Sequence, residues 1–233
     1  MSEISENVKR VLAEVASAAE RSGRSADEIT LVAASKMNDA HRVREAFDAG
    51  VRVFGENRVQ ELEEKADDGA YEGAQLHFIG HLQRNKVKNV VGRVALIQSV
   101  DSEELIRLIG RRATALGLTQ DVLLEVNIGR EVQKSGVLPE ESERYLQLIA
   151  ETPSIAVRGL MAIPPVSDDM RAARRYFDEM MKLFVDIGAK KYDNIHMEIL
   201  SMGMSADFEQ AILAGANMVR VGSAIFGARN YAL

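Results

Sequence analysis

Residues 29–36 read Ile29-Thr30-Leu31-Val32-Ala33-Ala34-Ser35-Lys36, a short apolar run that ends in a lysine and passes into a turn-like segment at 37–39. Residues two apart on a β-strand share a face, so Lys36 is predicted on the same side as Val32 and Ala34. An amine at the mouth of an apolar layer loses hydration, which lowers its pKa and makes it a nucleophile for an aldehyde. The alternative is an ordinary lysine whose ammonium reaches water past the strand end.

Seven further apolar runs follow the first, and amphipathic helical patterns separate them. The eight predicted strands are 29–35, 51–54, 76–79, 94–98, 121–127, 155–161, 195–200 and 217–221. The helical patterns lie near 39–49, 57–67, 83–91, 102–116, 139–151, 168–187 and 205–214, and one more helix precedes the first strand. Eight strands with helical crossovers predict an α/β fold, a single (β/α)8 TIM barrel with an additional N-terminal helix.

A doubly wound open sheet is the rival architecture. It would normally carry a glycine-rich fingerprint after its first strand, and the segment after Lys36 has none. No linker rich in proline, serine or glycine interrupts the chain, and its composition does not shift between halves. We therefore expect one barrel domain over residues 1–233.

Composition limits the classes of function. The net charge of −6 and the pI of about 5.4 argue against nucleic acid as a partner. The chain has no cysteine, which excludes disulfides and thiolate chemistry. The N-terminal apolar residues form a helical stripe rather than a signal peptide, and no apolar run approaches the roughly 20 residues of a membrane span. A cytoplasmic protein that contacts no membrane is expected.

The predicted strand ends are rich in polar residues and glycine. In chain order they carry Lys36, Gly55-Glu56-Asn57, Gly80-His81, Ser99-Val100-Asp101, Asn127, Met161-Ala162-Ile163-Pro164, Ser201-Met202-Gly203-Met204-Ser205 and Arg220-Val221-Gly222-Ser223. In a barrel these ends meet at one rim, and that rim holds the active site. The pattern predicts a single site that faces Lys36.

Two of these loops have the features of a phosphate site. Ser205 is predicted as the N-cap of the helix at 205–214, and Gly203 allows backbone N–H groups to approach an anion. The segment 222–227 repeats the arrangement after the last strand, and loops after strands seven and eight are the usual phosphate site of this fold. Simple helix capping is the alternative. Asp207 would compete with a phosphate unless its carboxylate points away.

Arg220 lies in the last predicted strand, two residues before Gly222. Its guanidinium could bind a second anion or the ring nitrogen of a pyridine. Arginine stays protonated, so a pyridine nitrogen that faces it would stay unprotonated and the ring would be a poor electron sink.

Other polar residues near the rim have less specific interpretations. His77 and His81 cannot share a metal ion along an extended segment, where four residues span about 13 Å, so no metal site is predicted. Glu56 is expected to line the site, to cap a helix, or to pair with Arg58 or Arg52.

Several motifs together resemble the YggS/PROSC family of pyridoxal phosphate (PLP) homeostasis proteins, and they cover nearly the whole chain. They are Ala34-Ser35-Lys36, Phe54-Gly55-Glu56-Asn57-Arg58-Val59-Gln60-Glu61, His77-Phe78-Ile79-Gly80-His81-Leu82-Gln83, Val126-Asn127-Ile128, Gln133-Lys134-Ser135-Gly136, Arg158-Gly159-Leu160-Met161, Leu200-Ser201-Met202-Gly203-Met204-Ser205-Ala206-Asp207-Phe208 and Val219-Arg220-Val221-Gly222-Ser223-Ala224-Ile225-Phe226-Gly227. The chain differs from the usual family pattern at Met37, Asp39 and Leu76.

This resemblance implies a barrel like the N-terminal domain of alanine racemases, with PLP held as a Schiff base on Lys36. It also implies that Arg220 faces the pyridine nitrogen and that Asn57 lines the ring pocket. The phosphate would be held by Ser201, Gly203, Met204, Ser205, Gly222 and Ser223.

The function implied by the resemblance is intracellular PLP (vitamin B6) homeostasis without a catalytic residue, and the protein would pass PLP to apo PLP-dependent enzymes. A monomer is expected. One alternative is a PLP-dependent amino-acid racemase, which needs a second base; Tyr231 is the only late tyrosine. Another is a class I aldolase that uses Lys36 without a cofactor. Lys134 is either a second amine site or a surface lysine.

Overall fold

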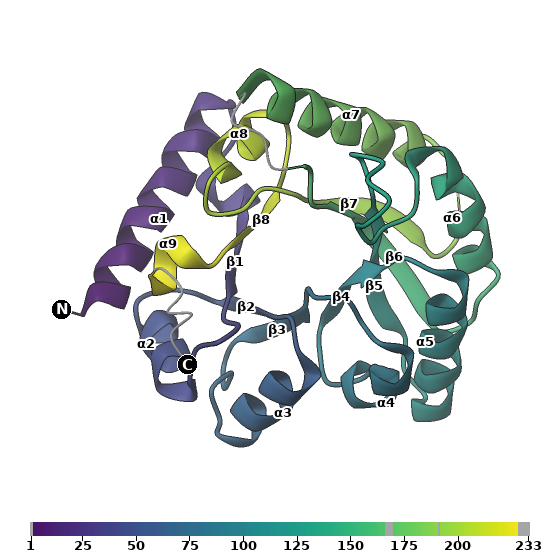
Figure 1. The fold of residues 1–233 in the computed structure, drawn as a ribbon, viewed down its shortest axis with the longest axis horizontal. Helices are drawn as coiled ribbons and strands as arrows, with labels where there is room; N and C mark the ends of the chain where they lie inside the picture. Colours follow the sequence, from purple (N-terminus) through teal and green to yellow (C-terminus); the bar gives the residue numbers. More distant parts are fainter. Residues whose placement is uncertain (1, 166–169, 191, 228–233) are drawn as a thin grey trace.

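The computed structural model describes residues 2–165, 170–190 and 192–227. Eight parallel strands pair in sequence order and close into a barrel, which confirms the predicted TIM barrel (Figure 1). The strands are β1 Thr30–Ala34, β2 Val53–Glu56, β3 Gln75–Phe78, β4 Leu96–Val100, β5 Gln120–Val126, β6 Ile155–Ala162, β7 Ile195–Ser201 and β8 Met218–Val221. Each predicted strand is present, although β2 and β4 begin slightly later than the apolar runs suggested.

Helices surround the barrel and connect its strands (Figure 1). They are α1 Glu3–Arg21, α2 Ala40–Asp48, α3 Val59–Asp67, α4 Val87–Val90, α5 Glu103–Leu116, α6 Ser142–Ala150, α7 Met170–Gly188, α8 Phe208–Leu213 and α9 Ser223–Phe226. Short 3-10 helices lie at Ala26–Glu28, Arg84–Lys86 and Pro139–Glu141. The predicted N-terminal helix is confirmed as α1. The short helix α9 was not predicted. Among the described helices, none combines the length and apolarity needed to span a bilayer.

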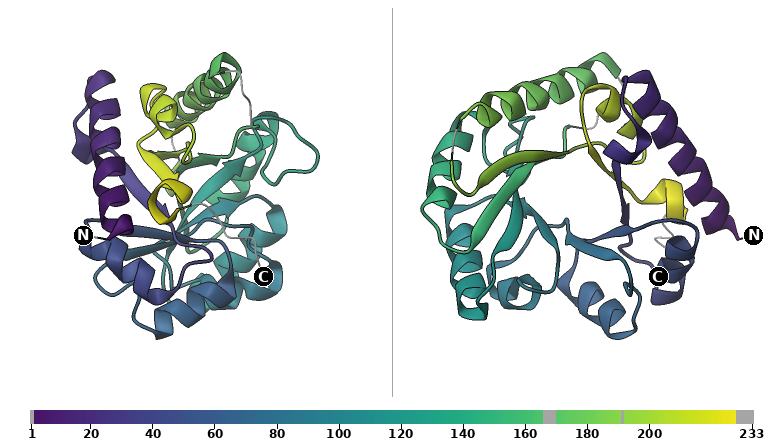
Figure 2. Two further views of the ribbon diagram at one scale, coloured as in Figure 1. Left: turned by 60° about the vertical axis from the view of Figure 1, so that its left-hand side comes forward. Right: turned by 180° about the vertical axis from the view of Figure 1, so that it is seen from behind.

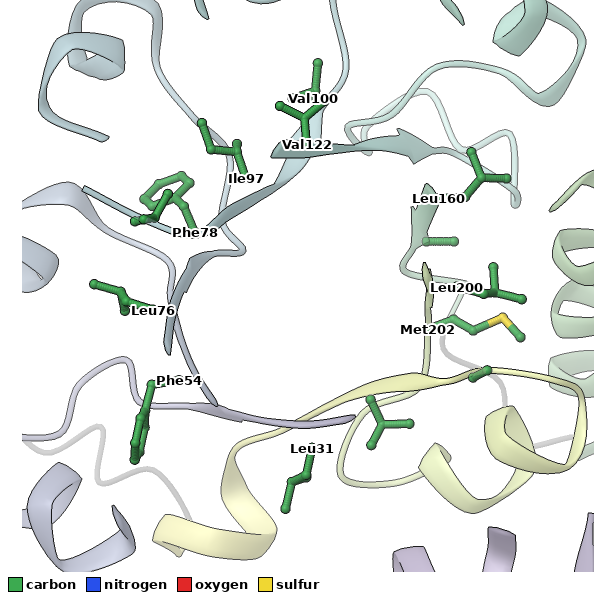
Figure 3. Packing of buried hydrophobic residues seen from close by; sticks show 14 of the residues in the cluster. Leu31, Phe54, Leu76, Phe78, Ile97, Val100, Val122, Leu160, Leu200 and Met202 are labelled. Atoms are coloured by element: carbon green, nitrogen blue, oxygen red, sulfur yellow. The ribbon is translucent and has the colours of Figure 1, made fainter. Parts of the chain in front are cut away.

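Alternation along the strands creates two apolar layers. Outward-facing residues such as Leu31, Phe54 and Leu160 pack against the helices, and Figure 3 shows their side chains pointing away from the barrel axis. A second cluster inside the barrel contains Val32, Leu96, Leu123, Met161 and Met218. Because both faces of the sheet are covered, the strands read as continuous apolar runs in the sequence.

Strand register decides which polar residues enter the barrel. Val32, an interior residue, pairs with Val53 on β2 and with Arg220 on β8. Arg220 therefore shares the interior face with Val32 and Val53. The predicted interior position of Val32 is confirmed; Lys36 and Asn57 lie just beyond the ends of β1 and β2, at the rim.

The N-terminal helix α1 packs against the last two helices, α8 and α9, and so covers the seam between β8 and β1 (Figure 2). Side chains of α1 also bond to the backbone of the C-terminal segment. Arg10 donates to the carbonyl of Ala224 at 2.9 Å, and Asn7 donates to the carbonyl of Ile225 at 3.2 Å. The loop that bears Gly222 is thereby fixed from outside the barrel.

Candidate functional site

Lys36 is half-buried at the carboxyl end of β1 and lines a cleft of about 590 Å³ with Asn57, Gly80 and His81. The Oδ1 atom of Asn57 is buried and has no hydrogen-bond partner among the described residues. A buried acceptor without a partner costs free energy that a bound donor would recover. The cleft is therefore lined by both a lysine and an amide whose oxygen lacks a partner among the described residues.

Arg220 is almost fully buried inside the barrel. Its Nη1 donates to the Ser201 hydroxyl at 2.5 Å, and its Nη2 donates to the carbonyl of Ala162 at 2.9 Å. Burial lowers the pKa of Arg220 to about 10, while Glu125 and Asp207 act in the opposite direction. The guanidinium is thus still charged at neutral pH.

A chain of side-chain hydrogen bonds leads from Arg220 into the barrel. The Ser201 hydroxyl donates to Gln98 Oε1 at 2.7 Å, and Gln98 Nε2 lies 3.0 Å from Nδ1 of His77. Burial lowers the pKa of His77 to about 4, so its ring is neutral and Nδ1 can accept from the amide. The Ser201 hydroxyl thus bonds to both Arg220 and Gln98. The sequence predicted that Ser201 contacts the phosphate. We propose instead that Ser201 supports Arg220.

Glu125 is a second titratable group in the barrel interior. It is buried on β5 and lines a hollow of about 350 Å³ that shares Asn57 with the cleft at Lys36. Burial raises the pKa of Glu125 to about 7, Asp101 raises it further, and Arg220 lowers it. A carboxyl group that titrates near neutral pH therefore lies close to Arg220. The raised pKa of this residue depends on burial, so no sequence pattern indicated it.

The two loops expected to bind phosphate are joined by Ser205. Its hydroxyl accepts hydrogen bonds from the N–H groups of Gly222, at 3.1 Å, and Ala224, at 3.3 Å. The prediction that Ser205 caps the helix after β7 is wrong, because α8 begins at Phe208 with Asp207 as its N-cap. Ser205 instead caps the following helix, α9. The Ser205 hydroxyl is thus the shared acceptor of two backbone donors and links the loop after β7 to the loop after β8.

Neighbouring residues in these loops fix their shape. The N–H of Met204 donates to Asp207 Oδ1 at 2.6 Å, so this carboxylate does compete for a donor expected to hold phosphate. Gly203 has φ +94°, and a Cβ there would lie 2.6 Å from Cβ of Ala211. Only glycine fits that conformation without strain. Ser223 is exposed at the start of α9.

Gly222 brings these loops close to β1, the strand that precedes Lys36. A Cβ on Gly222 would lie 3.3 Å from the carbonyl oxygen of Ala34 and 3.4 Å from its Cβ. The close approach places the loop after β8 beside the last residue of β1. The Gly222 loop therefore lies next to the end of β1, and Arg220 lies deeper in the barrel on β8, the strand that pairs with β1.

A buried polar cluster lies on the outer side of β1 and β2. Glu56 Oε1 accepts from the Ser35 hydroxyl at 2.6 Å, from Lys65 Nζ at 2.6 Å and from the Tyr71 hydroxyl at 2.7 Å. Glu56 is fully buried and Lys65 almost so. Glu56 therefore pairs with Lys65 rather than with the neighbouring arginines considered from the sequence. The apolar spacing of α3 could have shown that Lys65 lies on its buried face, with Val59 and Leu62.

Among the remaining candidates, His81 lines the cleft at Lys36, whereas His77 and Lys134 do not. His81 is exposed and lies 3.5 Å from Asp101, whereas His77 is inside the barrel. Lys134 pairs with Glu131 at 2.5 Å and donates to the carbonyl of Pro164 at 3.3 Å. Tyr231, the candidate second base, lies outside the described residues.

The donor set fits PLP: an amine for the aldehyde, a cation for the ring nitrogen and paired loops for the phosphate. Residues 7–230 match the family described as alanine racemase, N-terminal domain. The pyridoxal phosphate homeostasis protein of Aquifex aeolicus (strain VF5) is 42% identical over 226 residues, which cover 97% of this chain and 98% of that protein. The chain belongs to the pyridoxal phosphate homeostasis protein family.

Two other members of this family are similar to the chain over nearly its full length. The pyridoxal phosphate homeostasis protein of Escherichia coli (strain K12) is 39% identical over 235 residues, and the match covers 99% of both chains. PipY of Synechococcus elongatus PCC7942, whose structure has PLP bound, is 30% identical with a TM-score of 0.82. That match covers 97% of this chain and 100% of PipY.

Proposed function

We propose that this protein binds PLP at the rim of its barrel and acts in PLP homeostasis, as a carrier that passes PLP to apo PLP-dependent enzymes. The observation that carries the proposal is the position of Lys36. It lies two residues beyond the end of β1 and lines one cleft with Asn57, whose Oδ1 has no partner among the described residues. The adjacent strand β8 carries Arg220 and leads into the Gly222 loop. We also propose that the protein is a single-domain monomer of the cytoplasm.

The chain's residues have distinct roles in this proposal. Lys36 supplies the amine for a Schiff base with the aldehyde of PLP, and Asn57 contacts the ring. Arg220 faces the ring nitrogen, supported by Ser201. A second group of residues holds the phosphate through backbone N–H groups and hydroxyls, namely Gly203, Met204, Ser205, Gly222 and Ser223.

The charge on Arg220 disfavours broad amino-acid chemistry on the bound cofactor, although a racemase with two catalytic bases would tolerate it. When bound, PLP can act as an electron sink, and it does so well only if its ring nitrogen is protonated. The pKa of Arg220, about 10, keeps the guanidinium cationic at neutral pH. A nitrogen that faces this cation is disfavoured from taking up a proton. The bound cofactor is then held but poorly activated.

Covalent trapping tests the binding proposal. Purified protein mixed with PLP should develop the absorbance of a Schiff base, and borohydride should fix the pyridoxyl group to Lys36 for detection by peptide mass spectrometry. Lys36→Ala should lose this absorbance. A pyridoxyl group found on Lys134 but not on Lys36 would contradict the proposal.

Cofactor transfer and turnover test the carrier role. PLP-loaded protein should restore the activity of an apo PLP-dependent enzyme, and Lys36→Ala should do so less well. Racemisation or transamination of common amino acids should remain far below the usual enzyme turnover of about 10 s⁻¹. Turnover near that value would favour the racemase instead.

A further inference from the structure

The peptide groups on both sides of Lys36 are held by charged side chains of α3. Lys65 Nζ donates to the carbonyl of Ser35 at 2.8 Å. Glu61 Oε2 accepts from the N–H of Met37 at 2.6 Å. These two peptide groups directly precede and follow Lys36, so a lysine–glutamate pair on one helix grips the backbone at the carboxyl end of β1.

The two gripping side chains are themselves fixed. Lys65 Nζ lies 3.2 Å from Glu61 Oε2 and 2.6 Å from Glu56 Oε1. Lys65 is nearly buried, and Glu61 keeps only 18% of its side-chain surface exposed. Hydrogen bonds that involve a charged partner are stronger than neutral ones, and burial removes competition from water. The bonds of Lys65 to Ser35 and Glu56 are therefore shielded from water, whereas the bond from the Met37 N–H to Glu61 is exposed.

The backbone after Lys36 has a conformation that needs such support. Met37 has φ +61°, in the left-handed region that non-glycine residues rarely occupy. Met37 is 55% exposed, so packing does not hold this conformation. Two hydrogen bonds hold it instead: the Met37 N–H donates to Glu61, and the Asn38 N–H donates to the carbonyl of Ser35 at 3.1 Å. The strained residue follows Lys36 directly, and strain of this kind persists only where the surroundings enforce it.

We propose that Lys65 and Glu61 are positioning residues that clamp the backbone around Lys36 and so hold its amine in the orientation that reacts with PLP. This inference rests on the proposed function, in which the Lys36 amine forms a C=N bond with the PLP aldehyde and the aldehyde oxygen leaves as water. In this role the clamp acts on the backbone of Lys36, although Glu61 also lines the cleft at Lys36. It therefore raises the fraction of molecules whose amine is competent to react.

The decisive comparison uses two ligands that differ at one group. PLP carries the aldehyde, whereas pyridoxine 5′-phosphate carries an alcohol there and cannot form the C=N bond. Glu61→Ala should weaken PLP binding about tenfold, in keeping with the loss of one charged hydrogen bond. Binding of pyridoxine 5′-phosphate should stay unchanged. Glu64→Ala is the matched control, since Glu64 is exposed on the same helix and carries the same charge.

Two further measurements separate positioning from folding. Amide exchange at Met37 should accelerate in Glu61→Ala and not in Glu64→Ala. Glu61→Gln keeps an oxygen acceptor for the Met37 N–H, so it should restore most of the PLP affinity. For Lys65, the double change Glu56→Gln with Lys65→Met avoids an unpaired buried carboxylate and should also weaken PLP selectively.

The outcomes distinguish this inference from the proposed function. If wild-type protein forms the Schiff base on Lys36 and Glu61→Ala binds PLP as Glu64→Ala does, the clamp is refuted and the proposed function stands. Equal losses for PLP and pyridoxine 5′-phosphate would show that Glu61 shapes the pocket, which also refutes the clamp. If wild-type protein forms no Schiff base on Lys36, the proposed function fails and the inference with it.

Discussion

Replacement of Glu125 by glutamine should change how the stability of the protein depends on pH. The side chain keeps its size and hydrogen-bonding capacity, but it can no longer ionise. Glu125 is buried inside the barrel, and its pKa is raised from 4.5 to about 7, mainly by burial. The folded protein therefore binds a proton more tightly at this carboxyl than the unfolded chain does.

The direction in which stability changes with pH follows from proton linkage. A raised folded-state pKa gives stability that is fully present below pH 4.5 and is lost as the pH rises through about 7. At about 1.4 kcal/mol per pH unit, the loss reaches ~3 kcal/mol at pH 8. Glu125→Gln should therefore be more stable than wild type by up to this amount at pH 8, and equally stable at pH 4.

His77 acts in the opposite direction over nearly the same range. Burial lowers its pKa from 6.5 to about 4, so its stabilising contribution is present above pH 6.5 and is lost as the pH falls through about 4. In wild-type protein the pH-dependent contributions of Glu125 and His77 to stability oppose each other between pH 4.5 and pH 6.5. In Glu125→Gln only that of His77 remains, and stability should rise from pH 4 to pH 6.5.

Urea unfolding of PLP-free protein at a series of pH values measures these differences. Glu64→Gln provides a control for the loss of an exposed carboxylate. The reasoning is refuted if Glu125→Gln and wild type keep a constant stability difference across the whole pH range. It is also refuted if the variant is the less stable protein at pH 8, because Glu125 would then be stabilised as a carboxylate.

Three more outcomes are expected. Lys65→Met leaves a buried carboxylate unpaired and should lower the free energy of unfolding by about 3–5 kcal/mol in urea titrations. Gly159→Ala would place a Cβ 1.8 Å from the carbonyl oxygen of Ile199 and should cost at least ~2 kcal/mol, more than Gly117→Ala, where nothing lies within 4 Å. Ser205→Ala should weaken binding of PLP by roughly 0.5–3 kcal/mol in titrations and leave binding of pyridoxal unchanged; equal losses would assign the serine to the fold.

Sequence patterns predicted the barrel because each strand and helix carries its own periodic signal. The interior position of Val32, and with it the face of Lys36, followed from alternation along one strand. The predicted start of α8 was wrong, because Ser205 has the chemistry of an N-cap but accepts hydrogen bonds from Ala224 of α9 and from its N-cap, Gly222. Such a bond joins loops that are separate in sequence, and no local pattern reports it.

The buried charges were the main omission at the site. Glu56 was identified as a polar residue of the rim, yet its partners come from α3 and from Tyr71, which only the packed structure brings together. Glu125 was read as part of an apolar strand. Its raised pKa depends on burial and on Asp101, both of which are properties of the closed barrel.

The seam of the barrel has a consequence for biosynthesis. The strand before Lys36 is β1, whereas Arg220 and Gly222 come from β8, and the two strands pair directly. A ribosome releases β1 long before β8, so a nascent chain has Lys36 at first without Arg220 or the loop after β8. If these residues hold PLP as proposed, stable loading must wait until β8 has been synthesised and has paired with β1.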